Sequence, residues 1–326
     1  MTDTPDTTDE TTPSALARAG DYVVNLGLRG AIKLALALPY EKRIPLMGWL
    51  TSRIVAPLAG YDKRVRENLS LICPDLPEEE VDRLVRAVPN NVGRTLIEIY
   101  SGEDFKARAR AAEIKGPGLA ALEQARAEGR PVILVTAHFG NYDAVRAKLI
   151  SLGHNMGALY RPMRNAYFNE HYVRSISAIG EPMFVQNRRG MMQLVKHLRS
   201  GGVLGILTDL NAHDGIPLPF FGQPALTSLG MAEMALKYDA ALIPIYGKRL
   251  ENGLDFEIHA SAPVPHSDPE TMTRATNDDL ERMVRENMDQ WFWIHRRWKH
   301  GTGPFAEYRV KRYAAGRGAP KDERRP

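Results

Sequence analysis

Hydrophobic and polar residues follow two different patterns along this 326-residue chain. Up to about residue 100, apolar positions recur every three or four residues, which predicts a run of helices. From Ala112 onward, short apolar runs alternate with helical patterns. That alternation predicts an α/β fold: a three-layer sandwich with a mostly parallel central sheet and a helical N-terminal part.

Prolines, glycines and capping residues set the expected limits of these elements. In the first third, helices are expected near 15–38, 43–59, 62–73, from 76 onward and 91–100. The later strands are expected near 131–137, 155–161, 202–208, 241–247 and 254–260, and the helices near 118–128, 142–152, 165–179, 189–200, 226–238 and 270–292. With no internal repeat or clear linker, residues 15–310 are expected to form a single domain. A disordered tail is expected at 1–14 and a basic tail at 311–326.

The stretch from Pro131 to Leu149 is the strongest candidate for chemistry. It reads as a buried strand that ends near His138, followed by a helix that Asn141 can cap. Residues five apart on a helix point about 140° away from each other, so His138 and Asp143 can meet only across a turn. Gly140 supplies the freedom for that turn. We therefore expect His138 to be a general base held by Asp143; a buried histidine satisfied by a carboxylate is the alternative.

Two more polar residues follow predicted strands, Arg161 and Asp209. Ligands of open α/β sheets gather beyond the carboxyl ends of the strands, so both are candidate substrate-binding residues together with Asn141. Arginine suits the paired recognition of phosphate or carboxylate. Arg164 and Arg189 are further candidates for such an anion site, and ordinary surface charge is their alternative.

Two aromatic segments suggest contact with lipid. Phe220 and Phe221 lie in a proline-bearing loop, where they either line a groove or pack in the core. Residues 290–300 interleave three tryptophans with basic residues, a mixture found at membrane interfaces and in single-strand nucleic-acid binding. No recognised nucleic-acid module is present, so we favour the membrane and expect no nucleic-acid partner.

Several other kinds of site are not expected. His213 and Asp214 have no further ligand at a suitable spacing, so no metal is expected. There is no phosphate loop, dinucleotide fingerprint or serine nucleophile elbow. The single cysteine, Cys73, excludes an internal disulfide and indicates a reducing compartment or its edge.

Charge and hydropathy at the two ends indicate a membrane surface. The net charge is +4, and residues 309–326 carry seven Lys or Arg against two acids, which favours anionic partners; a solvated tail is the alternative. The apolar stretch from Val23 to Leu38 is interrupted by Arg29 and Lys33. A spanning helix needs about 20 mostly apolar residues, so residues 15–59 are expected to associate with the membrane interface rather than cross it. Packing on the protein's own core is the alternative, and no signal peptide is expected.

Six blocks in the right order resemble the lipid A late acyltransferase family, the lauroyl and myristoyl acyltransferases within the wider His-x4-Asp/Glu acyltransferases. These blocks are RVRENLSLICP from Arg64, HFGNYD from His138, YRPMRN from Tyr160, Arg188 to Asp209 with its terminal Thr-Asp, PFFGQPALTS from Pro219 and WFWIHRRWK from Trp291. The chain departs from the family in a less hydrophobic N-terminal segment and in Asp143, where many relatives have glutamate.

The resemblance implies transfer of a fatty acyl chain from acyl carrier protein, or coenzyme A, to a hydroxyl of a lipid A precursor or related glycolipid. It implies that His138 and Asp143 carry out catalysis, that Phe220 and Phe221 line an acyl groove, and that the protein lies on the cytoplasmic face of the inner membrane. It implies that no cofactor is needed. Acylation of a lysophospholipid or mannosylated lipid is the alternative within the same chemistry. A membrane-associated binding protein without catalysis is the alternative of another class.

Overall fold

The computed structural model describes residues 14–314. The predicted N-terminal tail therefore lies outside the described residues except for Ser14, and so does the basic tail beyond residue 314. The part of the basic tail that is described, residues 311–314, continues helix α13 (Pro304–Ala314).

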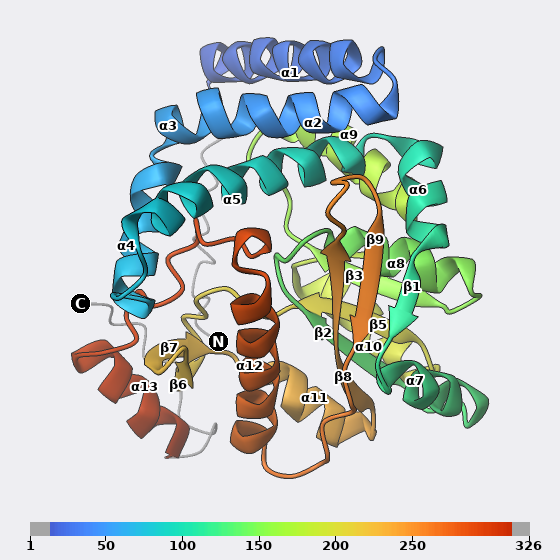
Figure 1. The fold of residues 1–326 in the computed structure, drawn as a ribbon. Helices are drawn as coiled ribbons and strands as arrows, with labels where there is room; N and C mark the ends of the chain where they lie inside the picture. The colour runs from blue at the N-terminus through green and yellow to red at the C-terminus, as the bar shows by residue number, and fades with distance from the viewer. Residues whose placement is uncertain (1–13, 315–326) are drawn as a thin grey trace, which may run out of the picture.

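The first third is helical, as predicted, and its helices stack over one end of the sheet (Figure 1). They are α1 (Ala15–Leu36), α2 (Tyr40–Leu50), the π-helical turn η1 (Thr51–Val55), α3 (Ala56–Ala59), α4 (Tyr61–Ile72), α5 (Glu78–Ile99) and α6 (Gly102–Ala111). The predicted fourth and fifth helices are one helix, because α5 continues through Pro89 and packs along α2. The sequence pattern missed α6. Among residues 14–314, no helix is long and apolar enough to cross a membrane.

Seven strands form the central sheet, in the order β1-β9-β8-β2-β5-β3-β4. They are β1 (Glu113–Lys115), β2 (Val132–Thr136), β3 (Met156–Tyr160), β4 (Met183–Val185), β5 (Val203–Leu207), β8 (Ala241–Arg249) and β9 (Phe256–Ala260). All neighbouring pairs are parallel except β8 and β9. The five predicted strands are confirmed. Three-residue β1 and β4 were missed, since so short a run carries no periodicity.

Helices cover both faces of the sheet, which confirms the three-layer α/β architecture. The covering helices are α7 (Gly118–Ala127), α8 (Tyr142–Ser151), α9 (Ala166–Ile179), α10 (Arg188–Arg199), α11 (Gly230–Tyr238) and α12 (Pro269–Glu286). Along β2, Val132 and Leu134 pack in the core beneath α7 and α8, whereas Ile133 and Val135 pack in the core beneath α10 and α11. A strand buried on both faces reads as the continuous apolar run seen in the sequence.

A third core lies beside the sheet and contains the aromatic segments. The hairpin of β6 (Ile216–Phe220) and β7 (Gln223–Thr227), expected to be a loop, packs against the segment that follows the short helix η2 (Met288–Gln290). Trp291 and Trp293 are 0% exposed, so the prediction that these tryptophans lie at a membrane interface is wrong. Phe220 and Phe221 are buried against them, so core packing is correct and the predicted acyl groove is not formed there.

Candidate active site

Three neighbouring strands bring the candidate residues to one edge of the sheet. β2, β5 and β3 lie side by side and run parallel, and they end at Thr136, Leu207 and Tyr160. His138, Asp209 and Arg161 each follow one of these ends within two residues. The carboxyl ends of parallel strands meet at the same edge, which is where the sequence placed the site.

His138 is held by Asp209. Its Nδ1 lies 2.9 Å from Asp209 Oδ1, and its backbone N–H donates to Asp209 Oδ2 at 3.0 Å. The indole N–H of Trp291 donates to the same Oδ2 at 3.0 Å. A carboxylate on Nδ1 favours the tautomer that carries its proton there, which leaves Nε2 free to accept a proton. Asp209, predicted as a substrate-binding residue, is instead the carboxylate that holds the His138 ring.

The prediction that Asp143 meets His138 across the turn is wrong. Asp143 Oδ1 accepts from Arg146 Nε at 3.0 Å and from Arg146 Nη2 at 2.7 Å, and both side chains are buried. Asn141 caps α8, so Asp143 lies in the first helical turn and reaches the residue one turn ahead rather than back to His138. A carboxylate at a helix N-terminus is also favoured by the helix dipole.

The turn itself is anchored tightly at Gly140, as its sequence suggested. Gly140 has a positive φ of 51°, and a Cβ there would lie 2.0 Å from the carbonyl oxygen of Gly247. Its N–H donates to the carbonyl of Gln290 at 2.9 Å, and the N–H of Asn141 donates to the carbonyl of Gly247 at 2.8 Å. The turn is therefore fixed between β8 and the segment that follows α12.

Asn141 supports this turn and is not positioned to touch a substrate. Its side chain is 0% exposed. Its Oδ1 accepts from the backbone of Asp143 and Ala144, and its Nδ2 donates to Glu98 at 2.6 Å. Glu98 in turn forms a buried ion pair with Arg249. The prediction of a binding role for Asn141 is thus replaced by a structural one.

Electrostatics keep Asp209 ionised although it is 1% exposed. Burial raises the pKa of its carboxyl, but the charge and hydrogen bonds of His138, with a smaller contribution from His295, lower that pKa to a net value of about 2. An ionised carboxylate at this distance is able to stabilise a positive charge on the His138 ring.

Two cavities meet at His138 and Tyr142. The first, of about 280 Å³, lies against α5 and is mainly apolar. Its lining includes Tyr61, Val92, Thr95, Leu96, Ile99, Phe292 and His295. The second, of about 310 Å³, lies over β3 and β5, and its lining includes Asp143, Arg146, Met156, Ala158, Arg161, Tyr172 and Met183. His138 therefore lines two separate cavities, one against α5 and one over β3 and β5.

The predicted arginines are not brought together. Arg161 is exposed at the rim of the second cavity, in reach of the same space as His138. Arg164 is exposed in the segment before α9, and Arg189 is exposed in the first turn of α10. Neither lines either cavity at His138. Only Arg161 keeps its predicted place beside the base.

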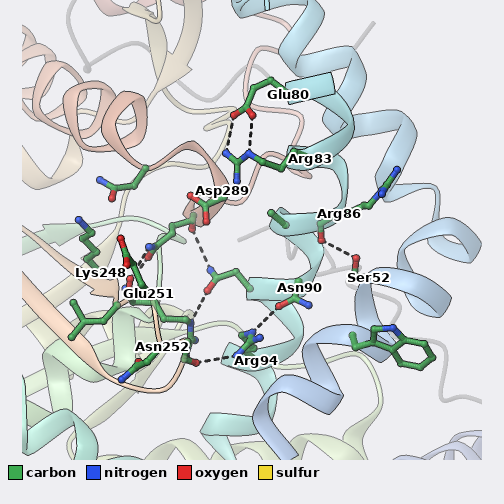
Figure 2. Close-up of a pocket in the computed structure, with 18 of the residues that line it drawn as sticks. Ser52, Glu80, Arg83, Arg86, Asn90, Arg94, Lys248, Glu251, Asn252 and Asp289 are labelled. Carbon is green, nitrogen blue, oxygen red and sulfur yellow. Dashed lines mark hydrogen bonds and ion pairs between the residues drawn. The ribbon is translucent and has the colours of Figure 1, made fainter. Parts of the chain in front are cut away.

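A larger groove of about 1680 Å³ lies on the other side of α5 and contains none of the predicted site residues (Figure 2). Two of the arginines that line it make hydrogen bonds within the groove wall. Arg83 pairs with Glu80, and Arg94 binds Asn90 and the carbonyl of Gly253. The contact of Arg94 with Gly253 joins α5 to the loop between β8 and β9. Because the groove lacks His138 and Asp209, we assign it no part in the chemistry.

Two residues beside the base were missed by sequence reasoning, Trp291 and His295. Both lie in the tryptophan-rich segment, whose composition pointed to a membrane. The His295 ring centroid is 4.9 Å from that of His138. The only local signal for them is the position of His295 four residues after Trp291, and only the fold brings this segment to the sheet edge.

Comparison with known proteins adds the family to this geometry. A family model described as bacterial lipid A biosynthesis acyltransferase matches residues 12–300. A lipid A biosynthesis acyltransferase of Haemophilus influenzae is 27% identical over 266 residues, 79% of this chain and 81% of that protein. The lipid A biosynthesis lauroyltransferase of Escherichia coli is 25% identical over 88% of this chain and 94% of its own length. A phosphatidylinositol mannoside acyltransferase of Mycobacterium tuberculosis is 21% identical over 73% of this chain and 78% of its own.

Proposed function

We propose that this chain, which belongs to the bacterial lipid A biosynthesis acyltransferase family, transfers a fatty acyl chain from a thioester donor to a hydroxyl of a lipid A precursor. The enzyme class, an acyltransferase, follows from family membership. The observation that carries the mechanism is the His138–Asp209 pair, placed where two cavities meet.

In this proposal His138 is the general base. Its Nε2 accepts the proton of the acceptor hydroxyl as the oxygen attacks the thioester carbonyl carbon. Asp209 holds the ring from the Nδ1 side and stabilises the imidazolium. Collapse of the tetrahedral intermediate breaks the carbon–sulfur bond, and the departing sulfur takes the proton back from Nε2. Base and partner are thus restored without a cofactor.

No cysteine nucleophile takes part in this scheme. Cys73 is the residue that follows the end of α4, and burial raises the pKa of its thiol, which disfavours the thiolate. It lines neither cavity at His138. Because His138 lines both cavities, the acyl group can pass directly from the thioester donor to the acceptor hydroxyl. The donor is proposed to be acyl carrier protein, with coenzyme A as the other thioester to test.

The acceptor is proposed to be a glycolipid bearing an anionic group near the reacting hydroxyl. Arg161, at the rim of the second cavity, is the residue proposed to hold that group. The lipid A precursor is favoured by the names of the Haemophilus and Escherichia relatives. The mycobacterial relatives favour a mannosylated lipid as the second candidate.

The enzyme is proposed to work on the cytoplasmic face of the inner membrane. Large apolar side chains are exposed along α1 and α3, including Val23 at 66%, Leu34 at 76% and Leu58 at 85%. Such a surface is suited to the lipid interface. Replacing Leu34 and Leu58 by glutamate is expected to weaken flotation with anionic liposomes, and flotation equal to the wild type would contradict this surface.

The test of the proposed function is acyl transfer by the purified protein. Labelled acyl carrier protein and acyl coenzyme A are each offered with a lipid A precursor, a mannosylated lipid and a lysophospholipid. We expect transfer to the lipid A precursor, and a fall of about 10²- to 10⁴-fold in His138→Ala. Transfer to another acceptor alone would replace the proposed substrate. Normal turnover by a folded His138→Ala protein would remove the mechanism.

A further inference from the structure

The turn that carries His138 offers none of its own amides to a substrate. The N–H groups of His138, Phe139, Gly140 and Asn141 donate to Asp209, Ala137, Gln290 and Gly247, respectively. The negative charge that develops on a thioester carbonyl oxygen during attack needs hydrogen-bond donors nearby. At this site those donors must come from groups other than these four amides.

His295 is a side chain without a hydrogen-bond partner beside the base. Its Nε2 is buried and, among residues 14–314, makes no hydrogen bond. Its ring lies 4.9 Å from the His138 ring and 4.3 Å from that of Phe292, centroid to centroid. Both histidines line the apolar cavity. A buried polar nitrogen left unpaired costs about 1–3 kcal/mol, so its presence here requires an explanation.

The backbone around His295 is held in place from α4. Asn68 Nδ2 donates to the carbonyl of Trp293 at 2.5 Å and to that of His295 at 2.9 Å. The N–H of Phe292 donates to the carbonyl of His138 at 2.9 Å. The two histidines are therefore fixed relative to each other through the backbone, which is the pre-organisation that an electrostatic contact with a transition state requires.

We infer that His295 is a second catalytic residue, whose ring N–H donates a hydrogen bond to the oxyanion formed when the acceptor hydroxyl attacks the thioester. This inference rests on the proposed function. The electron pair of the carbonyl moves onto its oxygen as the new carbon–oxygen bond forms, while His138 holds the hydroxyl proton. When the carbon–sulfur bond breaks, the pair returns and the hydrogen bond to His295 weakens. His295 keeps its own proton throughout.

A neutral ring suits this role. Burial, more than the nearby His138 and Arg64, lowers the pKa of His295 to about 4, although Asp209 acts in the opposite direction. At neutral pH the ring therefore carries one proton to donate and does not compete with His138 for the charge of Asp209.

The experiment compares substitutions that keep the ring stacking with one that keeps the donor. His295→Phe retains an aromatic ring but has no N–H, and His295→Gln retains an N–H. The matched control is His171→Phe, because His171 also has a buried Nε2 without a partner among the described residues and stacks on Tyr100, away from the base. Steady-state kcat and both KM values are measured with acyl carrier protein thioester and lipid A precursor.

We expect His295→Phe to lose about 10²- to 10³-fold in kcat with little change in either KM, since the contact is made only in the transition state. His295→Gln should recover part of the loss, and His171→Phe should resemble the wild type. The inference is overturned if His295→Phe has a normal kcat, or if only its KM values change. The proposed function stands in either case.

A wild type that acylates none of the acceptors overturns the proposed function and this inference together. If near-UV circular dichroism shows that His295→Phe does not fold, His295→Leu is compared with His295→Gln. Equal kcat in that pair also overturns the inference.

Discussion

Replacing Asp209 by asparagine tests which carboxylate serves the base. The substitution keeps shape and volume but leaves one acceptor oxygen in place of two. In the wild type, Oδ2 accepts from two donors, the His138 N–H and the Trp291 indole, whereas Oδ1 accepts only from the His138 ring. The amide is best satisfied with its oxygen at the Oδ2 position, which turns its NH₂ group toward His138 Nδ1.

That orientation reverses the tautomer of His138. With a donor facing Nδ1, the ring carries its proton on Nε2 and cannot accept one from the acceptor hydroxyl. Loss of the imidazolium's partner adds to this effect. We expect kcat for acyl transfer to fall about 10²- to 10⁴-fold, as for a base whose orienting carboxylate is removed.

The same substitution has a calculable effect on stability. The pKa of Asp209 is lowered from 3.8 to about 2 in the folded protein. A lowered carboxyl pKa stabilises the fold above pH 3.8, and this contribution is lost as the pH falls toward 2. At about 1.4 kcal/mol for each pKa unit, it amounts to about 2 kcal/mol at neutral pH. Asp209→Asn should lack this contribution to the free energy of unfolding. Its stability should therefore fall less than that of the wild type as the pH is lowered from 3.8 to 2.

The assay is steady-state acyl transfer on protein whose fold is verified by urea unfolding at pH 7. Urea unfolding at pH 7 and at about pH 2 then measures the acid sensitivity, because the Asp209 contribution is lost between pH 3.8 and 2. Asp143→Asn, prepared in parallel, is the matched control because it makes the same chemical change in a neighbouring buried carboxylate. A folded Asp209→Asn enzyme within fivefold of wild-type kcat would refute the reasoning. A large loss of kcat in Asp143→Asn but not in Asp209→Asn would instead support the His138–Asp143 pair that the sequence predicted.

Three further predictions concern stability, binding and pH. Asp143→Asn should cost about 3 kcal/mol in the free energy of urea unfolding, because the buried Arg146 loses its counter-charge, while kcat per folded molecule changes less than tenfold; unchanged stability would contradict the ion pair's role. Arg161→Ala should raise the KM for an anionic acceptor about tenfold without changing that for the donor, and an effect on the donor alone would reassign the residue. His295, with its pKa lowered from 6.5 to about 4, binds a proton more readily in the unfolded chain, so the wild type should lose about 3 kcal/mol as the pH falls from 6.5 to 4. In His295→Phe that loss should be smaller by this amount in urea titrations across the same range, and parallel pH profiles would show that His295 does not titrate as described.

The local sequence predicted the elements well where periodicity is long. The strand that ends near His138, the capped helix α8 and the alternation of strands and helices were all evident, because burial on both faces of β2 and capping by Asn141 leave local patterns. The short strands β1 and β4 and the proline-rich hairpin were missed, since their pairing is a property of their neighbours.

The aromatic residues show where composition misleads. Trp291 was expected at a membrane interface, and Phe220 either in a lipid-binding groove or in the core. Both form a buried core, and the Trp291 indole donates to Asp209. An aromatic residue with a polar N–H serves a membrane interface and a buried hydrogen bond equally well. Only the packing partners distinguish these two uses.

The sequence by itself determined the family, the choice of His138 as the candidate base and the sheet edge at which Asp209 and Arg161 join it. Only the tertiary structure decided which carboxylate holds the base. Asp143 is five residues away along the chain but faces Arg146 on its own helix, whereas Asp209 is 71 residues away and comes within 2.9 Å. The physical reason is that adjacent parallel strands align their carboxyl ends, so pairing in the sheet brings distant residues closer than a helical turn brings near ones.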